Sequence, residues 1–343
     1  SADPFDTALG LGQIGVSAAP NYISSFAPGV RTWAPGEEAR PAGAPGPIAP
    51  SSSYGSDVRV GIIDTGLGGK LSGMLPGTGV VSYRSAQSMR LTLLANGLVA
   101  PTYLQPTELA SGRAAGHGTF ITGLFRRALP GARIVVAQVP FYDAGDAAFG
   151  VPSWPGFTSN TSSRADDAAL TFMMFSSFVD SSARPNIDVL SLSFGSYGCG
   201  DAFETEKGPG DFRTPVGIRS ALLGLWELSG RNLKVAAAAG NDQTDEPFYP
   251  AAFAASACFE PSNVPPGNPP ASCEQTAAAV SPWLAGVSST PSSLGDYSNR
   301  ADWAAVLAQG SDVVSLMPDS TWASWSGTSF AAPCAAIFAG LKP

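Results

Sequence analysis

The chain has 343 residues, of which 44% are hydrophobic and 13% are charged, and its formal net charge is −8. This length and hydrophobic content suffice for one large core or two smaller ones. The acidic balance and the lack of a basic run argue against a nucleic-acid partner, and no apolar stretch reaches the roughly 18–20 residues of a membrane span. The first residues contain neither Met nor a charged-then-apolar pattern, which indicates a processed or trimmed start.

Residues 1–56 differ in composition from the rest of the chain. Eight prolines precede residue 51, and residues 41–53 are almost entirely Pro, Ala, Gly and Ser. Such a composition predicts an N-terminal arm or linker without regular structure. A disordered tail and an arm wrapped over the main domain both remain open. We therefore divide the chain into this arm, residues 1–56, and a main domain, residues 57–343.

Beyond the arm, short apolar segments typical of strands alternate with segments typical of helices. The predicted strands are residues 57–63, 133–139, 187–192 and 233–239, and the predicted helices are residues 119–127, 165–179 and 216–228. This alternation predicts an α/β fold with a mainly parallel sheet flanked by helices. In such sheets, functional side chains gather at the carboxyl ends of the strands.

Four polar residues lie at strand ends or helix starts. Asp64 ends the first predicted strand before a glycine turn, and Asn241 follows the fourth after Gly240. His117, the only histidine, precedes a predicted helix, and Ser329 begins a small-residue stretch. Each residue alone has an ordinary explanation as a turn residue or helix cap. Together they supply a nucleophile, a base, an orienting carboxylate and an oxyanion donor for acyl transfer.

Pro333 helps to place Ser329. Proline is tolerated in the first turn of a helix, where its missing N–H is no loss. We therefore expect Pro333 in a first turn and Ser329 at, or just before, a helix N-terminus.

Five motifs, in this order, resemble those of the subtilisin-like serine proteases, the subtilases of peptidase family S8. They are Ile62–Gly66, Gly116–Thr119, Asp188–Gly195, Ala238–Asn241 and Gly327–Pro333. The order Asp, His, Ser is that of subtilisin. The resemblance implies a three-layer subtilisin-like fold, with residues 57–343 as the catalytic domain. It also implies a serine endopeptidase that acts on polypeptides.

The resemblance further implies a role for each matching residue. Ser329 would attack the scissile carbonyl, His117 would accept and later deliver the proton, and Asp64 would orient the imidazole. Asn241 and the backbone N–H of Ser329 would bind the oxyanion.

Two further segments resemble the substrate-binding parts of the family. Ser193, Phe194 and Gly195 resemble the strand that pairs with extended substrate beside the S1 and S4 pockets. Ala238, Ala239 and Gly240 resemble the opposite wall of S1. Main-chain pairing of this kind accepts many substrate sequences.

The chain also departs from the family pattern. The stretch between His117 and Arg133 lacks the insertion that carries the strong calcium site of many subtilisins, so we expect that site to be missing. Other structural calcium sites are possible but not assignable, and the reaction requires no cofactor. Cys334 stands where the family usually has His.

Only fourteen residues follow Ser329, fewer than the family usually has. A truncated chain, a cleaved C-terminal segment and cover supplied by residues 1–56 are the three open explanations.

Four cysteines are present, and none has metal-ligand spacing. Cys258 and Cys273 bracket a loop that a disulfide would stabilise by about 3 kcal/mol, although four cysteines allow three pairings. This candidate bridge and the low lysine content favour a secreted or extracytoplasmic protein. We expect a monomer.

Other interpretations remain open. Asp242, Asp245 and Glu246 either favour basic P1 side chains or form a solvated acidic loop. The chain could also be a catalytically silent binding or structural module, although the intact set of four residues favours the enzyme. A sedolisin-type peptidase, which uses a carboxylate base, is disfavoured by the motif around His117.

Overall fold

The computed structural model describes residues 23–25, 39–46, 49–68, 77–85, 88–93, 99–104, 116–138, 164–197, 216–255, 283–291 and 296–340. Its centre is a seven-stranded sheet in the order β14-β13-β11-β9-β3-β7-β4, and each neighbouring pair is parallel. The strands are β3 (Arg59–Asp64), β4 (Val81–Ser85), β7 (Arg133–Gln138), β9 (Val189–Leu192), β11 (Lys234–Ala238), β13 (Leu284–Ser289) and β14 (Val306–Ala308).

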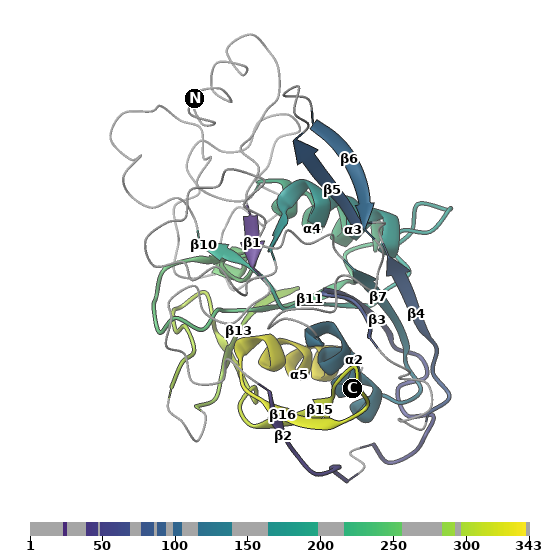
Figure 1. Ribbon diagram of the computed structural model, residues 1–343, viewed down its shortest axis with the longest axis vertical. Coiled ribbons are helices and arrows are strands. Elements are labelled where there is room, and N and C mark those ends of the chain that lie inside the picture. The colour runs from purple at the N-terminus through teal and green to yellow at the C-terminus, as the bar shows by residue number, and fades with distance from the viewer. Residues whose placement is uncertain are drawn as a thin grey trace.

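Helices cover both faces of this sheet, as Figure 1 shows. One face carries α3 (Asp167–Phe178) and α4 (Val216–Leu228), and the other carries α2 (His117–Ala128) and α5 (Thr328–Gly340). Strand side chains alternate between the two cores: Ile62 packs with α2 and α5, whereas Ile63 packs with α3 and α4. Parallel strands buried on both faces read as continuous apolar runs, which is how they were recognised in the sequence. The predicted three-layer α/β fold is confirmed.

Smaller elements surround the sheet. They are the antiparallel strands β15 (Val313–Leu316), β16 (Trp322–Trp325) and β2 (Arg40–Pro41), the pair β10 (Ser196–Tyr197) and β12 (Phe248–Tyr249), the hairpin β5 (Ser88–Leu93) and β6 (Val99–Leu104), the pair β1 (Ile23–Ser25) and β8 (Arg164–Asp166), and the 3₁₀ helix η5 (Ala251–Ala255). The β15-β16 hairpin leads directly into α5, so it helps to position the start of that helix.

Part of the N-terminal segment lies against this hairpin. β2 pairs with β16, and the N–H of Ala42 donates to the carbonyl of Trp322 at 2.9 Å. The Arg127 guanidinium of α2 donates to the carbonyl of Val314 at 2.6 Å and to that of Gly46 at 3.3 Å. Residues 39–46 are therefore held by backbone hydrogen bonds and by an arginine of the main domain.

Among the residues that the structure describes, no helix is long and apolar enough to cross a membrane.

Candidate active site

Asp64 and His117 form a buried pair at the carboxyl end of the sheet. Asp64 is the last residue of β3, and His117 is the first of α2. The Nδ1 atom of His117 lies 2.8 Å from Oδ1 and 3.0 Å from Oδ2 of Asp64. We assign the ring proton to Nδ1, because Nδ1–H can then donate a hydrogen bond to the carboxylate of Asp64, and this leaves the lone pair on Nε2.

Glycines allow the start of α2 to approach the end of β3. Gly116 has a φ of +89°, and a Cβ built on it would lie 2.6 Å from Cδ of Pro318. A Cβ on Gly118 would lie 2.4 Å from the carbonyl oxygen of Gly66. The N–H of Gly118 also donates to Oγ1 of Thr65 at 3.0 Å. The glycines around His117 are therefore required by backbone conformation and by close packing.

The rest of the His117 ring faces aromatic side chains. Its centroid lies 5.6 Å from that of Trp325 and 5.4 Å from that of Phe330. The ring is 1% exposed, and its Nε2 is buried without a hydrogen-bond partner among the described residues. Since Phe330 directly follows Ser329, the imidazole lies beside the start of α5.

Ser329 is the second residue of α5 and is 8% exposed. Its hydroxyl is directed at the carbonyl oxygen of Ser193, 3.4 Å away. In the part of the chain that the structure describes, no hydrogen bond joins it to Nε2 of His117. Catalytic hydrogen bonds are often long or poorly aligned in structures without substrate, so this orientation is compatible with a nucleophile.

Pro333 is not in the first turn of its helix, and that expectation was wrong. α5 begins at Thr328, which makes Pro333 its sixth residue. The missing N–H of Pro333 deprives the carbonyl of Ser329, four residues earlier, of its helical donor. The hydroxyl of Ser193 donates to that carbonyl at 2.7 Å instead. A side chain from the neighbouring loop thus makes the proline tolerable deeper in the helix.

Replacing Ser193 by alanine is expected to lower the free energy of unfolding by about 1–3 kcal/mol, because the buried carbonyl of Ser329 would lose its donor. Urea denaturation of both proteins measures this difference. Ser191→Ala is the matched control, since Ser191 lies on the adjacent strand and its buried hydroxyl has no partner among the described residues. Equal losses in the two variants would contradict the explanation.

Asn241 lies just beyond β11 and contacts the start of α5. Its Oδ1 accepts from both the N–H and the hydroxyl of Thr328, each at 2.9 Å. The N–H of Gly240 donates to the same hydroxyl at 3.0 Å. These contacts assign the amide orientation and leave Nδ2 of Asn241 without a partner within the described ranges. An N–H donor is therefore held beside the start of the serine-bearing helix.

The two predicted substrate-binding segments follow neighbouring strands. Ser193, Phe194 and Gly195 come after β9, and Ala238, Ala239 and Gly240 end or follow β11. The side chains of Ser193, Phe194, Ala238 and Ala239 are buried. The two segments therefore lie side by side at the carboxyl ends of neighbouring strands.

The acidic residues after Asn241 differ in environment. Asp245 and Glu246 are exposed, whereas Asp242 is half-buried and accepts a hydrogen bond from the hydroxyl of Tyr197 at 2.5 Å. This arrangement favours the solvated-loop interpretation over a pocket for basic P1 side chains.

The cysteines contribute nothing to the site as described. Cys334 lies on α5 with a free thiol, and burial raises its pKa to about 11, so it stays protonated at neutral pH. Cys199, Cys258 and Cys273 lie outside the described residues, and the Cys258–Cys273 bridge stays a prediction.

No group of three or more His, Cys, Asp or Glu side chains that could hold a metal is found in the described ranges, so we assign no calcium site.

Sequence reasoning missed Tyr197 and Asn299, which contact the loop that carries Asn241. Tyr197 lies two residues beyond the quoted motif Asp188–Gly195, and Asn299 belongs to no predicted element or quoted motif, so no local signal distinguished them.

The family model of the subtilase family, Peptidase_S8, matches residues 55–342. The chain belongs to the subtilase family, and it is accordingly a serine endopeptidase. Among curated proteins, the comparison found no match.

Three solved structures illustrate the likeness. A cold adapted subtilisin-like serine proteinase is 17% identical, with 86% of this chain and 77% of that chain covered and a TM-score of 0.46. A variant of the protease domain of PatA is 16% identical, with coverages of 85% and 81% and a TM-score of 0.49. The prenylagaramide maturation protease PagA is 16% identical, with coverages of 82% and 73% and a TM-score of 0.45.

Proposed function

We propose that this protein hydrolyses internal peptide bonds through an acyl-enzyme on Ser329. His117 takes the proton of the Ser329 hydroxyl through Nε2 and then delivers it to the leaving amine. Asp64 holds the imidazole in the tautomer that leaves Nε2 free, and it stabilises the imidazolium that forms. Water then attacks the acyl-enzyme with His117 again as base, which releases the second product and regenerates the serine.

The oxyanion of the tetrahedral intermediate lies, in this proposal, between two N–H donors. One is Nδ2 of Asn241, whose Oδ1 is anchored to Thr328, and the other is the backbone N–H of Ser329 at the start of α5. The positive end of the helix dipole adds to the stabilisation of the developing charge. Removal of one such donor in subtilisin costs roughly 10²–10³ in kcat.

The observation that carries the proposal is the buried contact of His117 Nδ1 with both oxygens of Asp64. The only histidine of the chain is thereby oriented by a carboxylate, and its other nitrogen has no partner in the described part of the chain. A general base needs such a free nitrogen beside the nucleophile, and the ring of His117 lies next to the start of the helix that carries Ser329.

Labelling with a fluorophosphonate probe tests the proposal directly. We expect the wild type to be labelled and Ser329→Ala and His117→Ala to remain unlabelled, because the probe reacts only with an activated serine. Ser326→Ala is the matched control, since Ser326 is a buried serine three residues from the nucleophile and bonds only the N–H of Asp312 in the described structure. A folded but unlabelled wild type would support the catalytically silent module instead.

Substrates bind, we propose, as extended polypeptides between residues 193–195 and residues 238–240. Backbone pairing accounts for binding of many sequences, because main-chain hydrogen bonds are independent of side-chain identity. We also propose that the protein acts as a secreted or extracytoplasmic monomer. The Cys258–Cys273 disulfide and any structural calcium belong to the same proposal, and the chemistry itself uses no cofactor.

A further inference from the structure

The side chain of Asn299 uses all the hydrogen-bonding positions of its amide. Its Oδ1 accepts from the N–H groups of Asp242 at 2.9 Å and Thr244 at 3.2 Å. Its Nδ2 donates to the carbonyl of Ala239 at 2.8 Å and to the hydroxyl of Tyr197 at 2.9 Å. Asn299 is fully buried, so loss of any of these bonds would leave polar groups unsatisfied.

These bonds hold the backbone before and after Asn241 in the sequence. Ala239 precedes Asn241, whereas Asp242 and Thr244 follow it. The backbone N–H of Asn299 also donates to the carbonyl of Gly240 at 3.0 Å. A Cβ built on Gly240 would lie 2.5 Å from Nδ2 of Asn299, so the loop is packed closely against this amide.

Tyr197 adds a second connection to the same loop. Its hydroxyl accepts from Asn299 and donates to Oδ2 of Asp242. Burial, together with the hydrogen bond to Asp242, raises the pKa of Tyr197 above its usual value, so the hydroxyl keeps the proton that it donates. The loop is thus held by two side chains that come from different parts of the chain.

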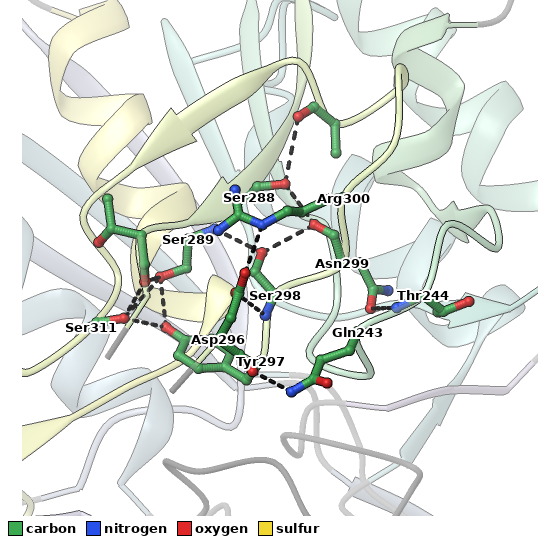
Figure 2. A network of polar contacts seen from close by, with 12 residues as sticks. Gln243, Thr244, Ser288, Ser289, Asp296, Tyr297, Ser298, Asn299, Arg300 and Ser311 are labelled. Carbon is green, nitrogen blue, oxygen red and sulfur yellow. Dashed lines mark hydrogen bonds and ion pairs between the residues drawn. The ribbon is translucent and has the colours of Figure 1, made fainter. Parts of the chain in front are cut away.

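The segment that carries Asn299 also supports the loop before Ser329. The hydroxyl of Tyr297 donates to the carbonyl of Gly310 at 3.1 Å and contacts the hydroxyls of Ser289 and Ser311, as Figure 2 shows for the side chains. The same carbonyl of Gly310 accepts from the N–H of Gly327 at 2.8 Å. Residues 297–299 therefore brace the loop of Asn241 and the loop that leads into α5.

We propose that Asn299 is a positioning residue that holds Asn241 where the oxyanion forms. The inference rests on the proposed function, in which Asn241 is an oxyanion donor. Asn299 touches neither substrate nor the reacting atoms, and it acts through the backbone of residues 239–244. A misplacement of about 1 Å can cost on the order of 10²-fold in rate, so a loosened loop has a measurable effect.

Asn299→Ala in the full chain is the first variant to measure. We expect kcat to fall by about 10- to 100-fold, because the oxyanion exists only in the transition state, and KM to change by a smaller factor, since Ala239 and Gly240 also belong to the proposed substrate-binding segment. Ser288→Ala is the matched control: the hydroxyl of Ser288 donates to the carbonyl of Asn299 at 2.7 Å but does not contact the loop of Asn241. This variant is expected to lower the melting temperature and to leave kcat unchanged.

A double-mutant cycle separates positioning from general destabilisation. In an Asn241→Ala background, Asn299→Ala is expected to lower kcat by less than about twofold, because the donor that it positions is already missing. Equal losses in both backgrounds would overturn the inference. If Asn241→Ala lowers kcat and Asn299→Ala does not, only the inference fails. If Asn241→Ala leaves kcat unchanged, the proposed oxyanion role fails and the inference fails with it.

Tyr197→Phe provides the same test should Asn299→Ala fail to fold. Phenylalanine keeps the ring and removes the hydroxyl that joins Asn299 to Asp242. We expect kcat to fall by about three- to tenfold in the wild-type background and to change little in the Asn241→Ala background. A loss of the same size in both backgrounds would overturn the inference in this form too.

Discussion

Replacing His117 by alanine is expected to lower kcat by a factor on the order of 10⁶, the size of the loss when the imidazole is removed from subtilisin. His117 is the only histidine, so no other imidazole can substitute as the base. The measurement is kcat and KM on a fluorogenic peptide selected from a mixed library. His117→Gln is a useful companion, because it preserves more of the volume that packs against Trp325 and Phe330.

Ser329→Ala and the double variant serve as controls for this expectation. The nucleophile and its base act as one unit, so the double variant is expected to lose no more activity than either single variant. Thermal unfolding of each variant shows that the fold persists. A His117→Ala enzyme that retains more than about one hundredth of the wild-type kcat would contradict the assignment of the base.

Asp64→Asn is expected to lower kcat by about 10⁴-fold, as the equivalent change does in another serine protease with this triad. The carboxylate of Asp64 accepts a hydrogen bond from Nδ1–H of His117 at 2.8 Å, whereas an asparagine amide can donate one there. The imidazole then carries its proton on Nε2 and cannot accept one from Ser329. Steady-state kinetics on the same peptide check this, and KM is expected to change little.

Asp188→Asn is the matched control for Asp64→Asn. Asp188 precedes β9 at the opposite end of the sheet, where its carboxylate pairs with the guanidinium of Arg59 at 2.5 Å. This change removes a carboxylate of the same type without touching the candidate site. We expect lower stability and an unchanged kcat. A loss below about tenfold for Asp64→Asn would show that Asp64 does not set the tautomer of His117.

Much of the sheet and of the helical layers was predictable from the sequence. The helix at residues 216–228 was predicted with the bounds that the structure shows, and the strands β3, β7, β9 and β11 were placed within one or two residues. These elements are apolar and buried, so their pattern is strong. The strands β4, β13 and β14 were missed. β13 has the sequence Leu-Ala-Gly-Val-Ser-Ser, which contains small and polar residues and carries little strand signal.

The arrangement of the candidate site was predictable where it depends on strand ends and not where it depends on tertiary contacts. Asp64 and Asn241 were found because they end or follow buried strands. The hydroxyl of Ser193 donates to the carbonyl of Ser329, which is 136 positions away in the sequence. The side chain of Asn299 donates to the carbonyl of Ala239, which is 60 positions away. Such contacts have no local pattern. The position of Pro333 within its helix was predicted wrongly for the same reason. The helix accommodates this proline because the side chain of Ser193, from another loop, donates to the carbonyl of Ser329.

The position of α5 in the chain bears on when the protein becomes active. This helix packs on β9, β11 and β13, and it follows all seven strands of the central sheet in the sequence. Asp64 and Ser329 therefore come to the same end of the sheet only after contacts between distant parts of the chain have formed, which is slow and entropically costly. Synthesis proceeds from the N-terminus, so the nascent chain carries Asp64 and His117, the proposed orienting carboxylate and base, long before Ser329, the proposed nucleophile. The proposed mechanism therefore does not allow the polypeptide to cleave itself or its neighbours until the serine-bearing helix has left the ribosome and docked.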